Sequence, residues 1–413
     1  MIERIEKLVL LVVVTIILGV VAGAVCWTFF FLMNNGIKLI WETLPNALGI
    51  TGFWMPLVVC TVGGILVGLF QKKWPGQPQE MDEVLAEVKA NGRYEYQNIG
   101  VGFVGALVPL LFGGCLGPEA GLTGVIAGLC TWVGDRLKFL RKEFKELSSV
   151  GIAAVITAVF NAPLFGLAVP IFGNAEGELH GDTIKVPKPA KIAIYLLAIA
   201  SALGSMMGLG LLLGGMGGLP HYSDVEIGWI EIAILIPCAI AGALVGWLFH
   251  CYGAFAKMIS CKIGDKPVVK ALVAGVALGA LGVVLPFTMF AGEIQVEELD
   301  GIWLEMGALV LIATALIKPF CLQFCLNMGW RGGKFFPMIF CGISLGYGIA
   351  YLSGADPVFC LCACTAGVLG TMMRQPLMAT LLLFLCFPLK SVFVLLVAAV
   401  IGSVVPVPRK WLS

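Results

Sequence analysis

Two glycine-rich segments, far apart in the sequence, each lead into an apolar stretch that predicts a helix. The first segment is Gly113–Glu119 and the second is Gly332–Pro337. The start of a helix leaves main-chain N–H groups without partners and carries about half a positive charge from the aligned peptide dipoles. Because glycine lets a ligand approach the main chain closely, two such starts directed at one point inside a membrane would bind a small anion. The anion could leave again, since partial charges hold it less tightly than a full charge would.

One carboxylate lies at the first of these two helix starts. Glu119 is the only acidic residue between Tyr96 and Asp135. An ionisable side chain in apolar surroundings is costly inside a membrane, and it indicates a function. At a helix N-terminus this carboxylate could compete with an anion for the same positive pocket, and its protonation would release the pocket. The alternative is that Glu119 only caps an exposed helix end and that the glycines only allow helices to pack closely.

The two segments belong to a pattern that occurs twice. Asn161–Leu164 follows the first segment and Arg374–Leu377 follows the second, and both end in Pro-Leu. We therefore expect a single transmembrane domain over residues 1–413, with a first repeat half over about 1–215 and a second, inverted half over about 216–413. Inverted repeats with helices interrupted by Gly and Pro are typical of transport proteins whose pathway lies between the repeats.

The elements that must position these residues are membrane-spanning helices. Hydrophobic residues make up 59% of the chain and charged residues only 12%, whereas an average soluble domain is about 25% charged. This composition excludes a disordered chain, a nucleic-acid-binding protein and a secreted disulfide scaffold. Eight charge-free stretches are long enough to cross a bilayer, which takes about 20 helical residues: 8–37, 43–71, 96–118, 147–175, 192–223, 232–256, 271–292 and 335–355. Shorter apolar runs broken by Gly or Pro predict broken or re-entrant helices, so the expected class is an all-α polytopic membrane protein.

The distribution of Lys and Arg predicts the orientation. The connections at 72–93, 136–145, 185–191 and 257–270 are basic, as are both ends of the chain, whereas 224–231 and 293–300 are acidic. Basic connections favour the cytoplasmic side. We expect a multi-pass protein of the plasma membrane with both termini in the cytoplasm.

Other chemistries find little support in the sequence. Nearly all of the 14 cysteines lie in apolar stretches, and the three histidines are far apart, so neither a disulfide framework nor a metal site is expected. No phosphate-binding loop, nucleotide fingerprint or nucleophile–base arrangement occurs. We therefore expect no enzyme, no cofactor and no nucleic-acid partner.

Several motifs, in order along the chain, resemble the CLC family of chloride channels and proton-coupled chloride exchangers. Gly333–Pro337 fits the family's GxFxP signature, and Gly117–Gly121 is similar to its G-[KR]-E-G-P signature with Pro118 in place of the basic residue. Phe160–Gly166 is close to FNAPLAG, Arg374–Leu377 is close to RAPL, and Trp74–Pro78 lies where the family carries GSGIP. The resemblance implies a helical inverted-repeat fold and a homodimer with one anion pathway per subunit. It also implies a divergent, prokaryotic-type member without cytoplasmic regulatory domains, which carries chloride and needs no cofactor.

The resemblance implies a role for each matching residue. Glu119 would be the external gating glutamate. The backbone amides of Glu119 and Ala120 would face the outer anion sites, those of Lys334–Phe336 would face the central site, and Pro75–Pro78 would mark the inner mouth. The residues expected along the anion pathway are Gly117, Pro118, Ala120, Gly121, Pro75, Gly76, Gln77, Pro78, Gly333, Lys334, Phe335, Phe336 and Pro337.

The sequence also departs from the family pattern. Pro75 replaces the inner serine, no tyrosine occurs at 409–413, and the exchangers' inner proton-transfer glutamate falls at Gly173. Glu176 and Glu178 lie nearby and could substitute for it. We therefore expect passive or weakly coupled conduction of small anions, chloride first among them.

Two alternatives stay open. One is a proton-coupled chloride or anion antiporter that uses Glu119 and another inner carboxylate. The other is a scaffold or a transporter of an organic solute, which the scarcity of polar side chains in the apolar stretches disfavours. The identity of the anion is open as well, because chloride, fluoride, bromide and nitrate would all satisfy the same backbone donors.

Overall fold

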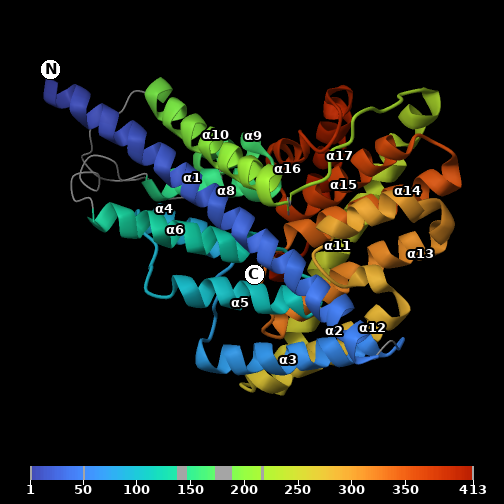
Figure 1. Cartoon of the computed structure of the whole chain (residues 1–413). Helices are drawn as coiled ribbons and strands as arrows, with labels where there is room; N and C mark the ends of the chain where they lie inside the picture. Colours follow the sequence, from blue (N-terminus) through green and yellow to red (C-terminus); the bar gives the residue numbers. More distant parts are fainter. Residues whose placement is uncertain (1, 50–51, 137–146, 173–187, 215–217, 412–413) are drawn as a thin grey trace. The chain divides into compact units, whose positions relative to one another are not determined.

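The computed structural model describes residues 2–49, 52–136, 147–172, 188–214 and 218–411, which fold almost entirely into helices (Figure 1). The helices are α1 (Ile2–Lys38), α2 (Leu44–Leu48), α3 (Met55–Lys73), α4 (Met81–Asn91), α5 (Ile99–Leu111), α6 (Glu119–Arg136), α8 (Leu147–Phe160), α9 (Pro163–Phe172), α10 (Lys188–Leu213), α11 (Trp229–Ile263), α12 (Pro267–Val284), α13 (Glu293–Asn327), α14 (Phe335–Ser353), α15 (Pro357–Met373), α16 (Pro376–Leu383) and α17 (Val392–Val404). Short π- or 3₁₀-helical turns are Leu39–Thr43, Pro286–Thr288, Leu389–Ser391 and Arg409–Trp411. The expected all-α class is confirmed.

Within the described residues, seven helices are long and apolar enough to cross a membrane. They are Val9–Ala47, Met55–Lys73, Ile192–Leu213, Trp229–Ile263, Pro267–Val284, Glu293–Asn327 and Phe335–Ser353. Six of them match expected stretches, and the multi-pass expectation is confirmed. The expected spans at 96–118 and 147–175 were wrong in length, because α5 has only 13 residues and the second stretch divides into α8 and α9.

The seventh span, α13, was not among the expected stretches. Its first turns are rich in glutamate, and Lys318 interrupts its apolar second part. The helix also turns at Gly307, where φ is 75° and ψ is 156°. These features divide the apolar pattern of α13 into runs that are too short to be recognised as one span.

The chain divides into two compact units, which are described separately. Unit 1 comprises Met1–Asn35, Gln77–Leu107 and Glu119–Gly218. Unit 2 comprises Gly36–Gly76, Val108–Pro118 and Leu219–Ser413. Each unit gathers segments that are distant in the sequence, which is a different division from one into repeats. The expected repeat halves on either side of residue 215 therefore stay a prediction.

In unit 1, α1 and α10 lie side by side (Figure 1). A Cβ atom at Gly19 would lie 2.5 Å from the carbonyl oxygen of Ala198, and one at Gly23 would collide with Ala202. The Ser205 hydroxyl donates a hydrogen bond of 2.9 Å to the Val20 carbonyl. Small residues let these helices approach closely, which is the usual way to gain packing energy between helices in a membrane.

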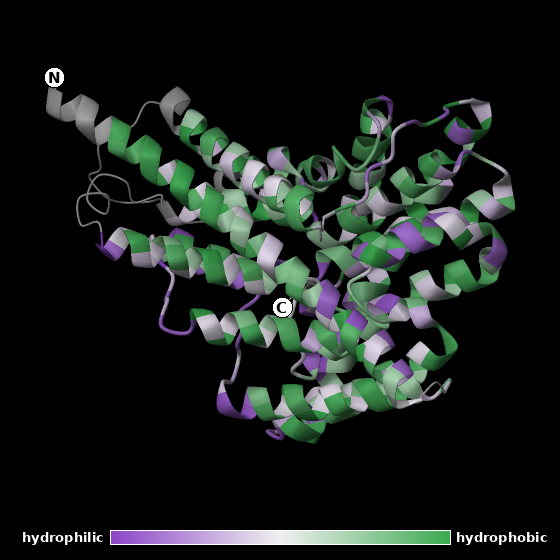
Figure 2. Cartoon of the chain, viewed as in Figure 1, coloured by the Kyte–Doolittle hydropathy of each residue, from purple (hydrophilic) through white to green (hydrophobic). Residues whose placement is uncertain are grey.

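In unit 2, α3 and α12 pack by the same means. A Cβ at Gly64 would lie 2.6 Å from the carbonyl oxygen of Ala271, and one at Gly279 would lie 2.6 Å from the α-carbon of Leu57. Figure 2 shows hydrophobic residues along most of α3 and α1, with hydrophilic residues at several helix ends and connections. This distribution fits helices whose sides face lipid or other helices and whose ends face water.

One local geometry occurs once in each unit. Asn161, after α8, has φ of 51°, and Arg374, after α15, has φ of 55°. A left-handed residue ends a helix, and a proline two positions later can start the next one because its missing N–H would have no partner there. Pro163 and Pro376 accordingly begin α9 and α16. The two Pro-Leu motifs of the sequence thus form the same helix–turn–helix break.

Candidate functional site

The two glycine-rich segments are hydrogen-bonded to each other in unit 2. The Gly117 N–H donates to the Gly333 carbonyl at 2.8 Å, and the Gly333 N–H donates to the Gly117 carbonyl at 2.7 Å. A Cβ at Gly332 would lie 2.7 Å from the Cβ of Leu116 and 3.2 Å from the carbonyl oxygen of Gly117. Segments that are distant in the sequence therefore lie backbone to backbone, and glycine is needed for this approach.

Each segment continues directly into a helix. α14 of unit 2 begins at Phe335, two residues after Gly333. α6 of unit 1 begins at Glu119, two residues after Gly117 in the chain. Each helix start supplies main-chain N–H groups and the positive end of a helix dipole. Each paired glycine thus lies two positions before a helix whose start can attract an anion.

The residues at both helix starts are buried. Gly117–Gly121 are buried, as are Gly333 and Phe335–Pro337, whereas Lys334 is partly exposed. The Glu119 side chain is only 1% exposed. The alternative in which Glu119 caps an exposed helix end therefore does not fit the structure. A buried ionisable side chain at this position retains its interpretation as a functional group.

The segment expected at the inner mouth divides between the two units. Pro75 and Gly76 belong to unit 2, where the Gly76 N–H donates to the Gln71 side chain at 3.1 Å. Gln77 and Pro78 belong to unit 1, where they line a pocket described below. The hydrogen bond of Gly76 thus goes to α3 and not to either paired glycine.

A buried lysine of unit 2 supports the first glycine-rich segment. Lys318 lies in α13 and is 0% exposed. Its Nζ donates to the carbonyls of Phe287 and Met289 at 2.8 Å each, to that of Phe290 at 3.1 Å and to the Gln295 amide oxygen at 3.3 Å. It also lies 4.5 Å from the centroid of the Phe340 ring.

The loop that surrounds this lysine is bonded to the glycine-rich segment. The Phe290 N–H donates to the Gly113 carbonyl at 3.1 Å, and the Cys115 thiol donates to the Lys318 carbonyl at 3.6 Å. The hydrogen-bond partners of the Lys318 ammonium within the described residues are neutral oxygens. Its positive charge is stabilised by dipoles, and no carboxylate of the described part of the chain bonds to it, so its field favours an anion nearby.

Lys318 could have been singled out from the sequence by the criterion that identified Glu119. It is a lone charge between two apolar runs, 306–317 and 319–330. By contrast, Gly173, Glu176 and Glu178 lie outside the described residues. The chain's last described turn, Arg409–Trp411, contains Trp411, whose ring lies 5.3 Å from that of Trp247.

Comparison with known families decides the identity. A family model described as "Voltage gated chloride channel" matches residues 63–406. This match covers most of the chain and includes both glycine-rich segments. The chain belongs to the voltage gated chloride channel family.

Known proteins agree with this membership. The chain is 28% identical over 356 residues to proteins described as "Putative ion-transport protein YfeO" from Escherichia fergusonii and Salmonella typhimurium. These alignments cover 83% of this chain and 79% and 81% of the two relatives. The resemblance to the CLC family that the motifs indicated is confirmed. This chloride channel family member belongs to the class of anion-transport proteins.

Solved structures show the same fold. A CLC-type fluoride/proton antiporter matches with a TM-score of 0.74 and 20% identity over 97% of this chain and 96% of that chain. A slow cyanobacterial Cl⁻/H⁺ antiporter matches with a TM-score of 0.78 and 18% identity over 95% of this chain and 93% of that chain. The expected CLC-like architecture of this family member is thus confirmed.

Proposed function

We propose that the protein carries small inorganic anions, chloride first among them, through a pathway lined by Gly117–Gly121 and Gly333–Pro337 and gated by Glu119. The observation that carries the proposal is the mutual hydrogen bonding of Gly117 and Gly333, because it joins the two segments that lead into helix starts. The burial of Glu119 and the positive charge of Lys318 support it. Main-chain donors and a nearby fixed charge suit a dehydrated anion without holding it permanently.

In the first form of the proposal, conduction is passive or weakly coupled. The sequence position that corresponds to the exchangers' inner glutamate is Gly173, and glycine has no side chain to carry a proton. Pro75 likewise has no hydroxyl to offer a central anion at the inner mouth.

Proton-coupled antiport is the second candidate, and two observations favour it. Glu119 is buried at a helix start, where a carboxyl group could alternate between holding a proton and excluding an anion. Both solved structures named above are described as antiporters that exchange an anion for protons. In this form Glu119 works with another inner carboxylate.

The remaining parts of the proposal concern the assembly and its setting. We place the protein in the plasma membrane with both termini in the cytoplasm, because basic connections favour the inner side. The homodimer is proposed from the resemblance to the CLC family. Chloride acts as the transported ion, and the pathway residues supply the chemistry without a cofactor.

Flux measurements on purified protein in liposomes test the proposal and separate its two forms. Chloride efflux above that of empty liposomes is expected in both forms. In the passive form a chloride gradient moves no protons, whereas in the coupled form it drives protons uphill and Glu119→Gln abolishes this movement. Glu226→Gln, in an exposed connection, is the matched control and should change neither flux. If efflux equals that of empty liposomes for chloride, fluoride, bromide and nitrate alike, the proposed function is wrong.

A further inference from the structure

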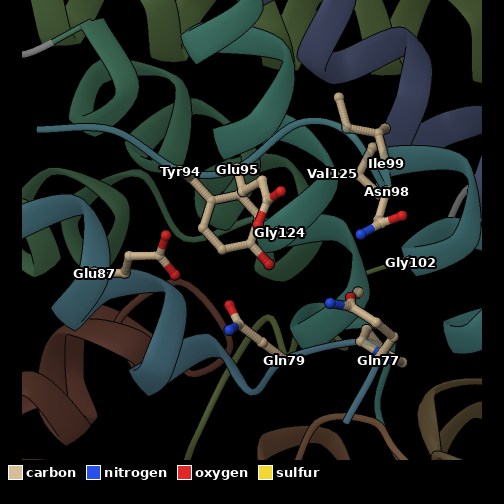
Figure 3. A pocket seen from close by; sticks show the side chains of 12 residues that line it. Gln77, Gln79, Glu87, Tyr94, Glu95, Asn98, Ile99, Gly102, Gly124 and Val125 are labelled. Atoms are coloured by element: carbon tan, nitrogen blue, oxygen red, sulfur yellow. The ribbon is translucent and has the colours of Figure 1, made fainter. Parts of the chain in front are cut away.

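Unit 1 contains a pocket that is lined only by residues of this unit. It holds about 450 Å³ of space that no atom fills, part of it open to solvent. Residues before α4, on α4, between α4 and α5, on α5 and on α6 line it. Figure 3 shows the side chains of Gln79, Glu87 and Tyr94 directed toward a common space. The pocket is therefore a partly open depression that residues of unit 1 form by themselves.

The fold of the segment after α4 creates this pocket. α4 ends at Gly92, whose φ is 65°, and the chain then runs along α6. Arg93 forms an ion pair of 2.8 Å with Asp135, and the Tyr94 N–H donates to the Thr131 hydroxyl at 3.0 Å. These contacts fix the position of Tyr94 against α6.

The α6 face of the pocket is formed by glycine. A Cβ at Gly124 would lie 3.3 Å from the Tyr94 hydroxyl oxygen, so the tyrosine reaches the helix backbone itself. Gly121, one turn earlier, also lines the pocket. Two residues of helix rotate by about 200°, which puts Glu119 on the other side of α6 from Gly121. The pocket and the gating carboxylate are thus distinct sites on opposite faces of one helix.

The charge of the pocket is opposite to that expected for an anion site. Its lining contains the carboxylates of Glu87 and Glu95 and no Lys, Arg or His. Arg93, the neighbouring cation, is held by Asp135 and does not line the pocket. Two carboxylates without a basic partner in the lining repel anions and attract cations.

Two neutral oxygens of the lining lack hydrogen-bond partners among the described residues. Tyr94 is only 8% exposed, and its hydroxyl makes no hydrogen bond there. The amide oxygen of Gln79 is buried without a donor. Burial and the charges of Glu87, Glu83 and Glu95 raise the pKa of Tyr94 to about 12. A tyrosine hydroxyl oxygen is neutral at physiological pH and can coordinate a cation, and a buried amide oxygen such as that of Gln79 is usually satisfied by a partner.

We propose that this pocket binds an alkali cation, Na⁺ or K⁺, through the carboxylates of Glu87 and Glu95 and the oxygens of Tyr94 and Gln79. Carboxylate, amide and hydroxyl oxygens are the ligands that hard cations prefer. A divalent ion fits less well, because the described residues contain no group of three or more acidic, His or Cys ligands. The pocket shares Gln77, Pro78 and Gly121 with the residues expected along the anion pathway, but the four proposed ligands are not among those pathway residues, so cation binding can be tested without anion flux. An effect of the bound cation on anion flux, transmitted through α6, does rest on that function.

Infrared difference spectroscopy of the reconstituted protein tests the proposal without measuring transport. N-methylglucamine chloride, whose bulky organic cation cannot be surrounded by the four oxygens as an alkali ion can, is exchanged for NaCl or KCl at constant ionic strength. We expect a saturable change in the carboxylate stretching bands. Glu87→Gln with Glu95→Gln should weaken the apparent affinity by about tenfold or more. Tyr94→Phe should weaken it less, and Glu226→Gln should leave it unchanged.

Two results would overturn the proposal. One is the absence of any Na⁺- or K⁺-dependent carboxylate change at physiological concentrations, which would leave a pocket filled by water alone. The other is a change that persists in the double variant. Tyr94→Phe and the single variant Glu95→Gln keep the test decisive if the double variant does not fold. Because cation binding and chloride efflux are measured separately, failure of the one does not imply failure of the other.

Discussion

The carbonyl cage around Lys318 allows a quantitative prediction. Lys318→Met keeps the length of the side chain and removes the ammonium group that satisfies three main-chain carbonyls and one amide oxygen. Each buried oxygen left without its partner costs about 1–3 kcal/mol, and four oxygens lose their donor here. Relief from burying a charge offsets part of this cost. We expect a net loss of about 2–4 kcal/mol in the free energy of unfolding.

The same substitution should weaken anion binding, because it removes a buried positive charge. At a separation of about 10 Å and an effective dielectric constant of about 20, one charge contributes roughly 1.7 kcal/mol, or roughly a 15-fold change in affinity. Lys318→Arg separates the two effects, since it keeps the charge but cannot reproduce the geometry of the cage. It should lose stability and retain most of the anion affinity.

Thermal unfolding in detergent and chloride binding by calorimetry are the two measurements. Lys262→Met, at the exposed end of α11, is the control and should change stability by less than about 0.5 kcal/mol. If Lys318→Met melts at the temperature of the wild type and binds chloride equally well, the ammonium neither holds the loop nor contributes to the field. The reasoning from its hydrogen bonds would then be refuted.

Three further predictions follow from other positions. Glu119→Gln should make anion flux independent of pH over the range in which the wild type responds, whereas Glu226→Gln should not; efflux against pH in liposomes shows which holds. Gly332→Ala should reduce chloride flux and lower the free energy of unfolding by about 1–3 kcal/mol, because the added Cβ overpacks against the first glycine-rich segment. The control is Gly208→Ala in α10, where nothing lies within 4 Å of the added Cβ; it should be neutral or stabilising in melting experiments. The pKa of Tyr94 rises from its ordinary 10.0 to about 12 on folding. Because the unfolded state loses this proton first, the free energy of unfolding should fall between these two pH values. Denaturant titrations across this range should show that Tyr94→Phe removes this part of the decline.

The sequence was sufficient to predict the class of fold and the meeting of the glycine-rich segments. Long apolar stretches and the repeated Pro-Leu motif are local patterns, and bilayer thickness converts them directly into helices and breaks. The pairing of Gly117 with Gly333 is not local, but both lie in motifs whose chemistry only makes sense if they converge. The membrane span in α13 was not predicted, because spans were identified as stretches without charge and Lys318 interrupts this one. Only the structure shows that carbonyls of a loop distant in the sequence accept hydrogen bonds from Lys318.

The cation pocket could not be predicted from sequence. Glu87 and Glu95 lie in a strongly charged region, which predicts only an exposed cytoplasmic connection. The pocket arises because Arg93 pairs with Asp135, 42 positions away, and draws the connection onto α6. Such tertiary contacts between an ordinary loop and a helix leave no periodic signal in the chain.

The bridge between Gly117 and Gly333 is made of peptide groups alone. Its peptide groups neither gain nor lose a proton at moderate pH, and they carry no net charge for salt to screen, so we expect the two hydrogen bonds to be insensitive to both. Any dependence of this membrane protein on pH or salt must therefore originate in side chains. The two main-chain hydrogen bonds keep the backbone between those side chains unchanged.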